Sequence, residues 1–178
     1  MGEPAEVSRG KEVPATAELL DGSRVTLREV TEDDRAAITA LANALSEEER
    51  YLRFFTAHPR YIDEWVSSLV DTSPDRCTLV AYDAATLVGV ANYTETRQPG
   101  CAEVALVVAH GQHHRGVGTV LLRTLGRIAQ AHGQRSFIAD VLADNREMHR
   151  VLSDSGWPCN YERDGPVVTV EVDLGQAR

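Results

Sequence analysis

Three consecutive segments of the sequence, residues 77–82, 87–94 and 102–108, are rich in valine, alanine and other residues that are common in buried β-strands. A short turn links the first two, so we expect them to pair with each other and with the third segment in an antiparallel arrangement. Apolar side chains then recur at helical spacing over residues 116–132. This order predicts a three-stranded meander that leads into a helix.

The rest of the chain alternates between strands and helices, which indicates an α/β protein. Start signals such as Ser46 followed by three glutamates precede the helical runs, because acidic residues near a helix N-terminus favour its dipole. The further strands are expected over residues 24–30, 136–142 and 167–172. The further helices are expected from residue 31 to about residue 45, from residue 46 onward, over residues 63–70 and over residues 144–155.

The composition is that of one globular domain. The chain has 178 residues, of which 43% are apolar and 25% charged, and this is enough to bury a substantial core. Residues 1–17 contain glutamate, proline and small residues without any periodicity. We therefore predict a flexible tail over residues 1–17 and a single domain over residues 18–178.

Several classes of function are excluded by composition. No apolar run approaches the ~18 residues of a membrane span and no secretion leader is visible, so we expect a cytoplasmic protein without a membrane partner. The net charge of −9 argues against a nucleic-acid partner, because non-specific binding depends on phosphate neutralisation by Lys and Arg. The three cysteines, Cys77, Cys101 and Cys159, are odd in number and widely spaced, which favours reduced thiols.

One segment of this acidic chain is free of acidic residues. Residues 104–139 contain no Asp or Glu, and the basic or near-basic residues in this window are Arg115, Arg123, Arg127, Arg135, His110, His113, His114 and His132. The pattern favours binding of an anion to a positive region. A chance run along one helix is the alternative.

The stretch "HHRGVG", residues 113–118, precedes the predicted helix directly. Its two glycines leave the backbone amides of a helix N-terminus accessible, which is the usual arrangement for binding phosphate. An ordinary strand-to-helix turn uses the same residues. Gly116 is not followed by Lys-Ser/Thr, and the third glycine of a dinucleotide fingerprint is missing. The nearby histidines lack the spacing of a metal site, so we expect them to be solvated and expect no metal.

The same six residues resemble the signature of the Gcn5-related N-acetyltransferases, Gln/Arg-x-x-Gly-x-Gly/Ala, although His113 replaces the first residue. The order of predicted elements resembles this family over residues 22–174. The resemblance implies the family's fold, a mixed and mostly antiparallel sheet of about six or seven strands flanked by helices. It also implies a splay between two parallel strands that holds acetyl-CoA.

The resemblance further implies which residues contact acetyl-CoA. The pyrophosphate would lie on the backbone amides of residues 114–119, and the pantetheine would run beside one strand of the meander. Asn145, at the start of the helix after the next strand, matches an asparagine that contacts the cofactor arm in the family. The implied contacts are Leu106, Val107, Val108, His114, Arg115, Gly116, Val117, Gly118, Thr119 and Asn145.

A transferase of this kind needs a base, because an amine is almost entirely protonated at neutral pH. Glu103 is the candidate, since burial in the apolar run "CAEVALVV" would suit a carboxylate to accept a proton. A glutamate that faces water at a strand end is the alternative. The amide near Val107 or Val108 would polarise the thioester carbonyl. Leu152 stands where many relatives carry a tyrosine that protonates the leaving thiolate, so water or no acid at all would serve here.

The acceptor is suggested by the segment "ERYLRFF", residues 49–55, which resembles the acetyltransferase domain of bacterial Pat-type protein lysine acetyltransferases. These relatives modify acyl-CoA synthetases, so a lysine on such a synthetase is the implied acceptor. The acidic runs at 32–34 and 47–49 would attract a basic protein surface, or they serve only as helix N-terminal acids. Tyr51, Leu52 and Phe55 also fit one buried helix face. A small-molecule amine as acceptor and a non-catalytic CoA-binding module are the alternatives.

Overall fold

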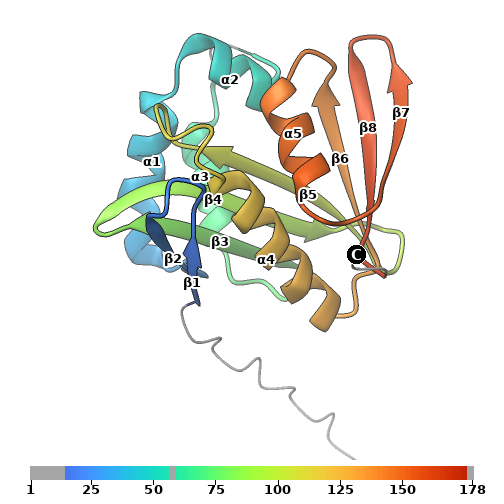
Figure 1. Ribbon diagram of the computed structural model, residues 1–178, viewed down its shortest axis with the longest axis horizontal. Helices are drawn as coiled ribbons and strands as arrows, with labels where there is room; N and C mark the ends of the chain where they lie inside the picture. Colours follow the sequence, from blue (N-terminus) through green and yellow to red (C-terminus); the bar gives the residue numbers. More distant parts are fainter. Residues whose placement is uncertain (1–14, 57–58, 176–178) are drawn as a thin grey trace, which may run out of the picture.

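The computed structural model describes residues 15–56 and 59–175, which form one sheet of eight strands with helices packed on both faces (Figure 1). The strand order is β1-β2-β3-β4-β5-β6-β8-β7, and every neighbouring pair is antiparallel except β5 and β6. The strands are β1 Ala15–Glu18, β2 Arg24–Glu29, β3 Arg76–Asp83, β4 Thr86–Glu95, β5 Cys101–Val108, β6 Ser136–Leu142, β7 Cys159–Asp164 and β8 Val167–Asp173.

The helices form two layers. Helix α4 crosses one face of the sheet with α5 beside it, and α1 and α3 pack on the other face (Figure 1). Each layer covers its own apolar cluster, one that includes Leu121, Leu125 and Phe137 under α4 and one that includes Ile38 and Leu69 under α1 and α3. The helices are the short 3-10 helix η1 Glu32–Asp34, α1 Arg35–Ala44, α2 Glu47–Phe54, α3 Ile62–Val70, α4 Val117–Ala131 and α5 Arg146–Asp154.

The predicted meander is confirmed, and it places the parallel pair beside it. β5 pairs with β4 along its whole length, from Glu95↔Ala102 to Gly89↔Val108. It pairs with β6 only at Cys101, Ala102 and Glu103. Beyond Glu103 the two parallel strands separate, so the splay implied by the family resemblance is present.

Both edge strands of the sheet correct the expected strand number of six or seven. β7 carries the sequence CNYERD and is exposed over most of its length, and β1 is a short exposed strand as well. Neither buries an apolar face, so neither shows the alternation that reveals a strand in sequence. The predicted tail at residues 1–17 falls largely outside the described residues, but Ala15–Ala17 belong to β1, which pairs with β2.

The helices begin close to where their start signals predict. Ser46 caps α2 by accepting from the N–H of Glu49 at 3.1 Å, and the Glu49 carboxylate accepts from the N–H of Ser46 at 2.7 Å. The helix expected from Thr31 is divided into η1 and α1. No helix of the described residues is long and apolar enough to cross a membrane.

Candidate active site

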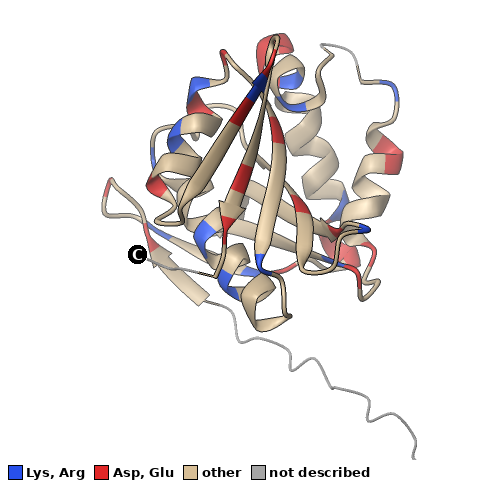
Figure 2. Cartoon of the chain, turned by 90° about the vertical axis from the view of Figure 1, so that its right-hand side faces the viewer, with Lys and Arg blue, Asp and Glu red and all other residues tan. Residues whose placement is uncertain are grey.

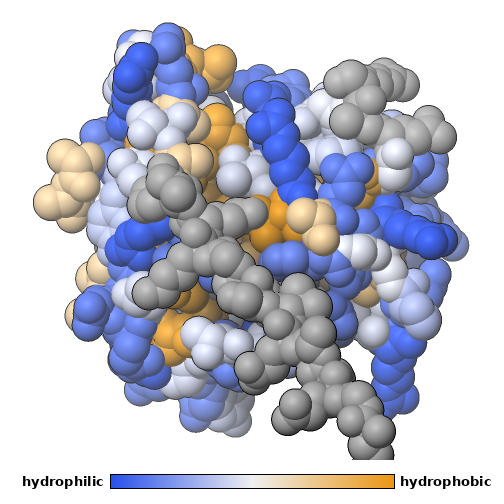
Figure 3. Space-filling model, turned by 90° about the horizontal axis from the view of Figure 1, so that it is seen from below, coloured by the Kyte–Doolittle hydropathy of each residue, from blue (hydrophilic) through white to orange (hydrophobic). Residues whose placement is uncertain are grey.

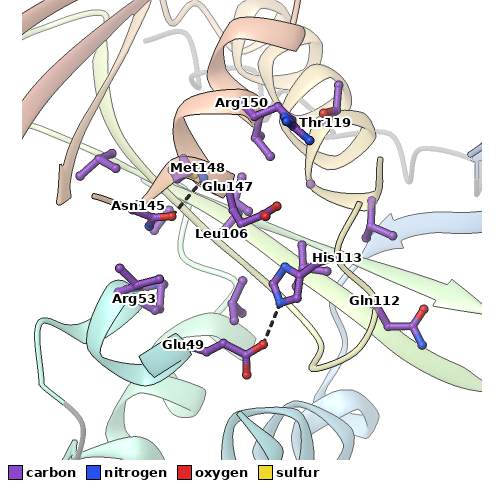
Figure 4. A pocket seen from close by; sticks show the side chains of 18 of the residues that line it. Glu49, Arg53, Leu106, Gln112, His113, Thr119, Asn145, Glu147, Met148 and Arg150 are labelled. Carbon is purple, nitrogen blue, oxygen red and sulfur yellow. Dashed lines mark hydrogen bonds and ion pairs between the residues drawn. The ribbon is translucent and has the colours of Figure 1, made fainter. Parts of the chain in front are cut away.

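A cavity of about 400 Å³ opens where β5 and β6 separate. β5 contributes residues 104–108 and β6 contributes residues 139–141. Parts of α2, of the loop before α4 and of α5 complete the walls (Figure 4). The cavity therefore lies at the carboxyl side of a parallel strand pair, a common place for ligands in mixed sheets.

Strand pairing determines which backbone groups of β5 face this cavity. The N–H of Ala109 donates to Val88 on β4, so in the alternating antiparallel ladder Val107 also faces β4. The N–H and C=O groups of Leu106 and Val108 face the opposite side, where β6 has separated from β5. Of the two amides expected to polarise a thioester, the amide of Val108 is the one that faces the cavity.

The loop between β5 and α4 has the backbone form that its glycines suggest. Gly116 is the N-cap of α4 with φ of 89°, a conformation that favours glycine. The amides that follow it open the first turn of α4, and residues 116–119 all line the cavity. Gly118 has a packing role as well, because a Cβ there would lie 2.9 Å from Cγ2 of Val151 on α5.

Arg115 does not line the cavity, in contrast to the other predicted cofactor contacts. Its guanidinium donates to Asp21 at 2.8 Å and to Asp83 at 3.0 Å, and these contacts raise the pKa of Arg115 above its usual value. Its carbonyl accepts from the N–H of Leu20 at 3.0 Å. Arg115 therefore fastens the loop to the neighbouring β-turns, and its side chain is not directed at a ligand.

The histidines of the loop contact carboxylates that the sequence did not reveal, although His110 and His114 remain exposed to solvent and only His113 is partly buried. Glu49 on α2 lies 2.8 Å from Nε2 of His113 (Figure 4). It also lies 3.0 Å from Nδ1 of His110. His114 pairs with Glu147 on α5 at 3.1 Å. Burial raises the pKa of Glu49, but the N–H of Ser46 and the two histidines outweigh it and keep this pKa below its usual value. Sequence analysis missed these contacts because Glu49 and His113 are far apart in the chain.

The loop part of the acid-free segment, before α4, is consequently not a free positive region. Carboxylates from other parts of the chain lie against His110, His113, His114 and Arg115. Among the described residues, no three or more His, Cys, Asp or Glu side chains form a group that could hold a metal ion.

Two arginines that line the cavity were not found by sequence analysis. Arg150 on α5 is exposed near Thr119, and Arg53 on α2 lies toward the other end of the cavity (Figure 4). Neither forms an ion pair within the described part of the chain, in contrast to Arg115. The signal that could have found Arg53 is its place in the segment 49–55, since one helical turn separates it from the cavity residue Glu49.

Asn145 lines the cavity and is the N-cap of α5, where its side-chain oxygen accepts from the N–H of Met148 at 3.1 Å. This bond fixes the amide and leaves its nitrogen as a donor. Leu152 is fully buried in the core, and its hydrocarbon side chain has no proton to give to a leaving group.

Glu103 is exposed, and so the burial expected for this carboxylate is absent. It lies at the point where β5 and β6 part, on the sheet face that also carries Val107 and the α1–α3 layer. The register places Ile138 beside Glu103 and Glu171 beside Ile138. In the next row, Asp140 pairs with Thr169 and Thr169 with Glu162.

These exposed carboxylates share one face of the sheet, which we call the acidic strand face and define as Glu103, Asp140, Glu162 and Glu171. Figure 2 shows acidic segments along the strands at this end of the sheet. The acidic strand face extends directly from the mouth of the splay, which favours approach of a cation.

Tyr51 on α2 and Phe55 at its C-cap do not share one buried helix face with Leu52, which corrects the packing interpretation. Phe54 is the aromatic residue of α2 that packs against the core. Tyr51 and Phe55 are each 46% exposed, whereas Leu52 lines the cavity. Of the two acidic runs, Asp34 is buried against Arg28 and Glu49 is engaged as described above. The runs therefore act mainly in capping, and the acidic strand face is the larger exposed negative region beside the site.

Comparison with known families decides the class of the protein. Residues 38–157 match the acetyltransferase (GNAT) family. The chain belongs to this family. The predicted family, fold and enzyme class are thus confirmed, and the GNAT domain is an acetyltransferase that uses acetyl-CoA.

Individual relatives agree with this assignment. An acetyltransferase of Pseudomonas aeruginosa is 29% identical over 142 residues, 77% of this chain and 76% of that protein. The crystal structure of the GNAT domain of S. lividans PAT is 29% identical with a TM-score of 0.81, and the match covers 90% of this chain and 96% of that domain. An acetyltransferase from Salmonella typhimurium, solved with its cofactor acetyl-CoA, shares the fold at 16% identity and a TM-score of 0.66, over 84% and 94% of the two chains.

The GNAT fold brings together nine of the ten predicted cofactor contacts around one cavity, all except Arg115. The proposed base Glu103 lies next to this cavity and not in its wall. The arrangement can hold a long ligand with phosphate groups at one end and expose the other end to a base and an acidic surface.

Proposed function

We propose that this GNAT acetyltransferase transfers an acetyl group from acetyl-CoA to the side-chain amine of a lysine on another protein, with an acyl-CoA synthetase as the implied acceptor. The observation that carries the proposal is the similarity to the GNAT domain of S. lividans PAT over 90% of the chain. The acidic strand face supports it, because a lysine within a basic surface would be attracted there.

The residues present fit acetyl-CoA. The left-handed Gly116 exposes the first amides of α4 for the pyrophosphate, with residues 114 and 116–119 around it and Arg150 nearby. The unpaired backbone groups of Leu106 and Val108 suit the amides of the pantetheine. The nitrogen of Asn145 is available as a donor to the same arm. Acetyl-CoA supplies an activated thioester and a thiolate leaving group.

The chain's own groups would act on the acceptor. Glu103 takes a proton from the lysine ammonium, directly or through water, and so creates the lone pair that the reaction needs. The lysine nitrogen forms a bond to the acetyl carbon as the C=O electron pair moves to oxygen; the pair then returns, the carbon–sulfur bond breaks, and the sulfur leaves with the bonding electrons. The amine loses its second proton to solvent, and the thiolate gains one from solvent, because Leu152 offers none.

The test is intact-mass spectrometry of a purified acyl-CoA synthetase incubated with the enzyme and acetyl-CoA. We expect the synthetase to gain one acetyl group, and to gain none with Glu103→Gln. The enzyme carries an internal control, because Lys11 is its only lysine and self-acetylation at lysine adds at most one group to it. An unmodified synthetase together with rapid turnover of polyamines or aminoglycosides would replace the protein acceptor by a small amine.

A further inference from the structure

Arg53 on α2 is a cation whose Nε is buried without a hydrogen-bond partner among the described residues. Its guanidinium carbon lies 5.0 Å from the ring centre of Phe54 and 5.6 Å from that of Trp65. The two rings meet edge to face at 5.1 Å, so they hold each other in place. Arg53 is therefore held by aromatic contacts and not by a carboxylate.

Such an arrangement costs free energy in the free protein. Burying the Nε of a guanidinium without a hydrogen-bonding partner is unfavourable, and cation–π contacts offset only part of the penalty. Burial lowers the pKa of the Arg53 guanidinium to about 10, although the negative charge of Glu103 opposes this effect. The group is still charged at neutral pH, and its N–H donors are preorganised for an acceptor that arrives with a ligand.

The position of Arg53 indicates which part of the ligand arrives there. The phosphate end of the cavity is marked by Gly116 and Thr119, beyond the C-terminal end of β5. Arg53 lies away from that end, with Arg150 and Thr119 on the far side of the cavity (Figure 4). It is also close enough to Glu103 for the two charges to interact. A ligand anchored at Gly116 and extended along β5 therefore brings its acyl end toward Arg53.

We propose that the Arg53 guanidinium donates a hydrogen bond to the carbonyl oxygen of the acetyl thioester and stabilises the negative charge that develops on this oxygen. The inference rests on the proposed function only in requiring acetyl-CoA in this cavity. As the amine nitrogen bonds to the acetyl carbon, the electron pair of the C=O double bond moves to oxygen next to Arg53. The pair returns when the carbon–sulfur bond breaks and the thiolate leaves, so Arg53 neither gains nor loses a proton.

Two other roles are compatible with a buried arginine and predict different results. A purely structural Arg53 holds α2 against α3 through Phe54 and Trp65. An Arg53 that recognises a carboxylate on the acceptor would affect only those acceptors that carry one. A donor to the thioester affects every acceptor equally, because the thioester is common to all of them.

The test is the infrared band of acetyl-CoA labelled with ¹³C at the acetyl carbonyl, measured free and bound to the enzyme, with no acceptor present. We expect binding to shift the band to lower frequency, because a cationic donor polarises the C=O bond. The band returns toward its solution position in Arg53→Met and lies between the two in Arg53→Lys. Arg150→Met is the matched control, a second cavity arginine whose loss weakens binding without moving the band.

The outcomes separate this inference from the proposed function. Failure to bind acetyl-CoA at all would contradict both the proposed function and the inference. Normal binding with the same band position in wild type and Arg53→Met overturns the inference alone. Arg53→Gln, which removes the charge but keeps a polar side chain, replaces this variant should Arg53→Met not fold. Where turnover is measured, kcat in Arg53→Met should fall on the order of 10²-fold for every amine tested, with the Kd of acetyl-CoA nearly unchanged. A loss confined to carboxylate-bearing acceptors would assign Arg53 to acceptor recognition instead.

Discussion

Glu103 stands on an exposed part of β5, beside the point where β5 and β6 separate, and is the base that we propose. Glu103→Gln keeps the shape of the side chain but cannot accept a proton. The maximal rate at neutral pH should therefore fall on the order of 10²–10⁴-fold, with the Kd of acetyl-CoA nearly unchanged. Steady-state kinetics with the preferred acceptor and calorimetry with acetyl-CoA measure the two quantities.

The matched control is Glu29→Gln, an exposed strand carboxylate on β2 that β3 and β4 separate from β5. It should leave both the rate and the Kd unchanged. Full activity in Glu103→Gln would mean that another group or water accepts the proton.

Asp34, unlike the exposed Glu103, is a buried carboxylate whose two oxygens both accept hydrogen bonds. Both of its oxygens accept from Arg28, at 2.8 and 2.7 Å, and the Tyr82 hydroxyl donates to it at 2.7 Å. Burial raises the pKa of Asp34, but these donors and the N–H of Thr31 outweigh it and lower the pKa to about 2. Asp34→Asn should lower the free energy of unfolding by about 3 kcal/mol, measured in urea, because it leaves Arg28 unpaired.

The same carboxylate gives stability a defined pH dependence. Because folding lowers the pKa of Asp34, its contribution is present above the unfolded pKa of about 4 and is lost as the pH falls toward 2. The wild type should therefore lose more stability than Asp34→Asn over this interval. Asp33→Asn, an exposed neighbour in η1, should retain the wild-type pH dependence. Identical profiles for Asp34→Asn and the wild type would show that the pair does not stabilise the fold.

Individual residues could be predicted from the sequence where their role depends on local chain geometry. The residues around Gly116 form a continuous stretch, so a motif identifies them, and they do line the cavity apart from Arg115. The engagement of Glu49 with His113 joins α2 to the loop before α4, across 64 positions of the chain. No local pattern encodes such a contact, and the same limit hid Arg150, whereas Arg53 lies within the segment 49–55 that the sequence already singled out.

The loop before α4 is the element to which we assign the pyrophosphate of acetyl-CoA. Gly116→Ala places a side chain in the left-handed region, which costs about 1 kcal/mol of stability, and its Cβ would meet Cγ of Leu20 at 3.2 Å. The strained N-cap should turn the first amides of α4 away from the pyrophosphate and weaken acetyl-CoA binding roughly tenfold. Calorimetry on the folded variant measures this affinity.

Gly111→Ala is the control in the same loop. Gly111 has φ of 80° with nothing within 4 Å of its Cβ position, and it lies outside the cavity wall. It should carry the same backbone strain without the loss of affinity. Equal affinities for Gly116→Ala and Gly111→Ala would place the pyrophosphate away from α4.

At the level of helices and strands, prediction succeeds where an element buries an apolar face. The central strands and α4 each contribute several buried apolar residues, and their positions agree closely with those expected. β1 and β7 are held by backbone pairing at the two edges of the sheet, so their sequences need no apolar alternation. The prediction that Tyr51 and Phe55 are buried was wrong for a related reason. α2 lies over the open splay, where there is no continuous sheet surface to bury them.

In the whole molecule, charge is distributed by the fold rather than by position in the sequence. The segment without acidic residues is matched by Glu49, Glu147, Asp21 and Asp83 from distant parts of the chain. The net charge of −9 comes instead from exposed carboxylates on surfaces such as the acidic strand face beside the splay. On the face seen in Figure 3, the visible apolar residues lie in small groups among polar ones.

The acidic strand face makes a prediction about the acceptor. Reversing two of its charges in Glu162→Lys/Glu171→Lys should raise the KM for a protein acceptor roughly tenfold at low salt, because electrostatic attraction governs encounter with a basic surface. The kcat should stay the same, since neither residue lies in the cavity. The KM is measured at two ionic strengths, and the difference from the wild type should shrink at high salt.

The control must change the net charge equally, so that a local effect is separated from a global one. Glu18→Lys/Asp33→Lys reverses two exposed charges on β1 and η1, away from the splay. An equal rise in KM in both double variants would mean that the total charge of the molecule, and not the acidic strand face, attracts the acceptor. If neither variant changes the KM for a protein acceptor but Glu162→Lys/Glu171→Lys weakens turnover of a polyamine, the acidic strand face serves a small cation, because a short polyamine can reach these two carboxylates and Glu103 together.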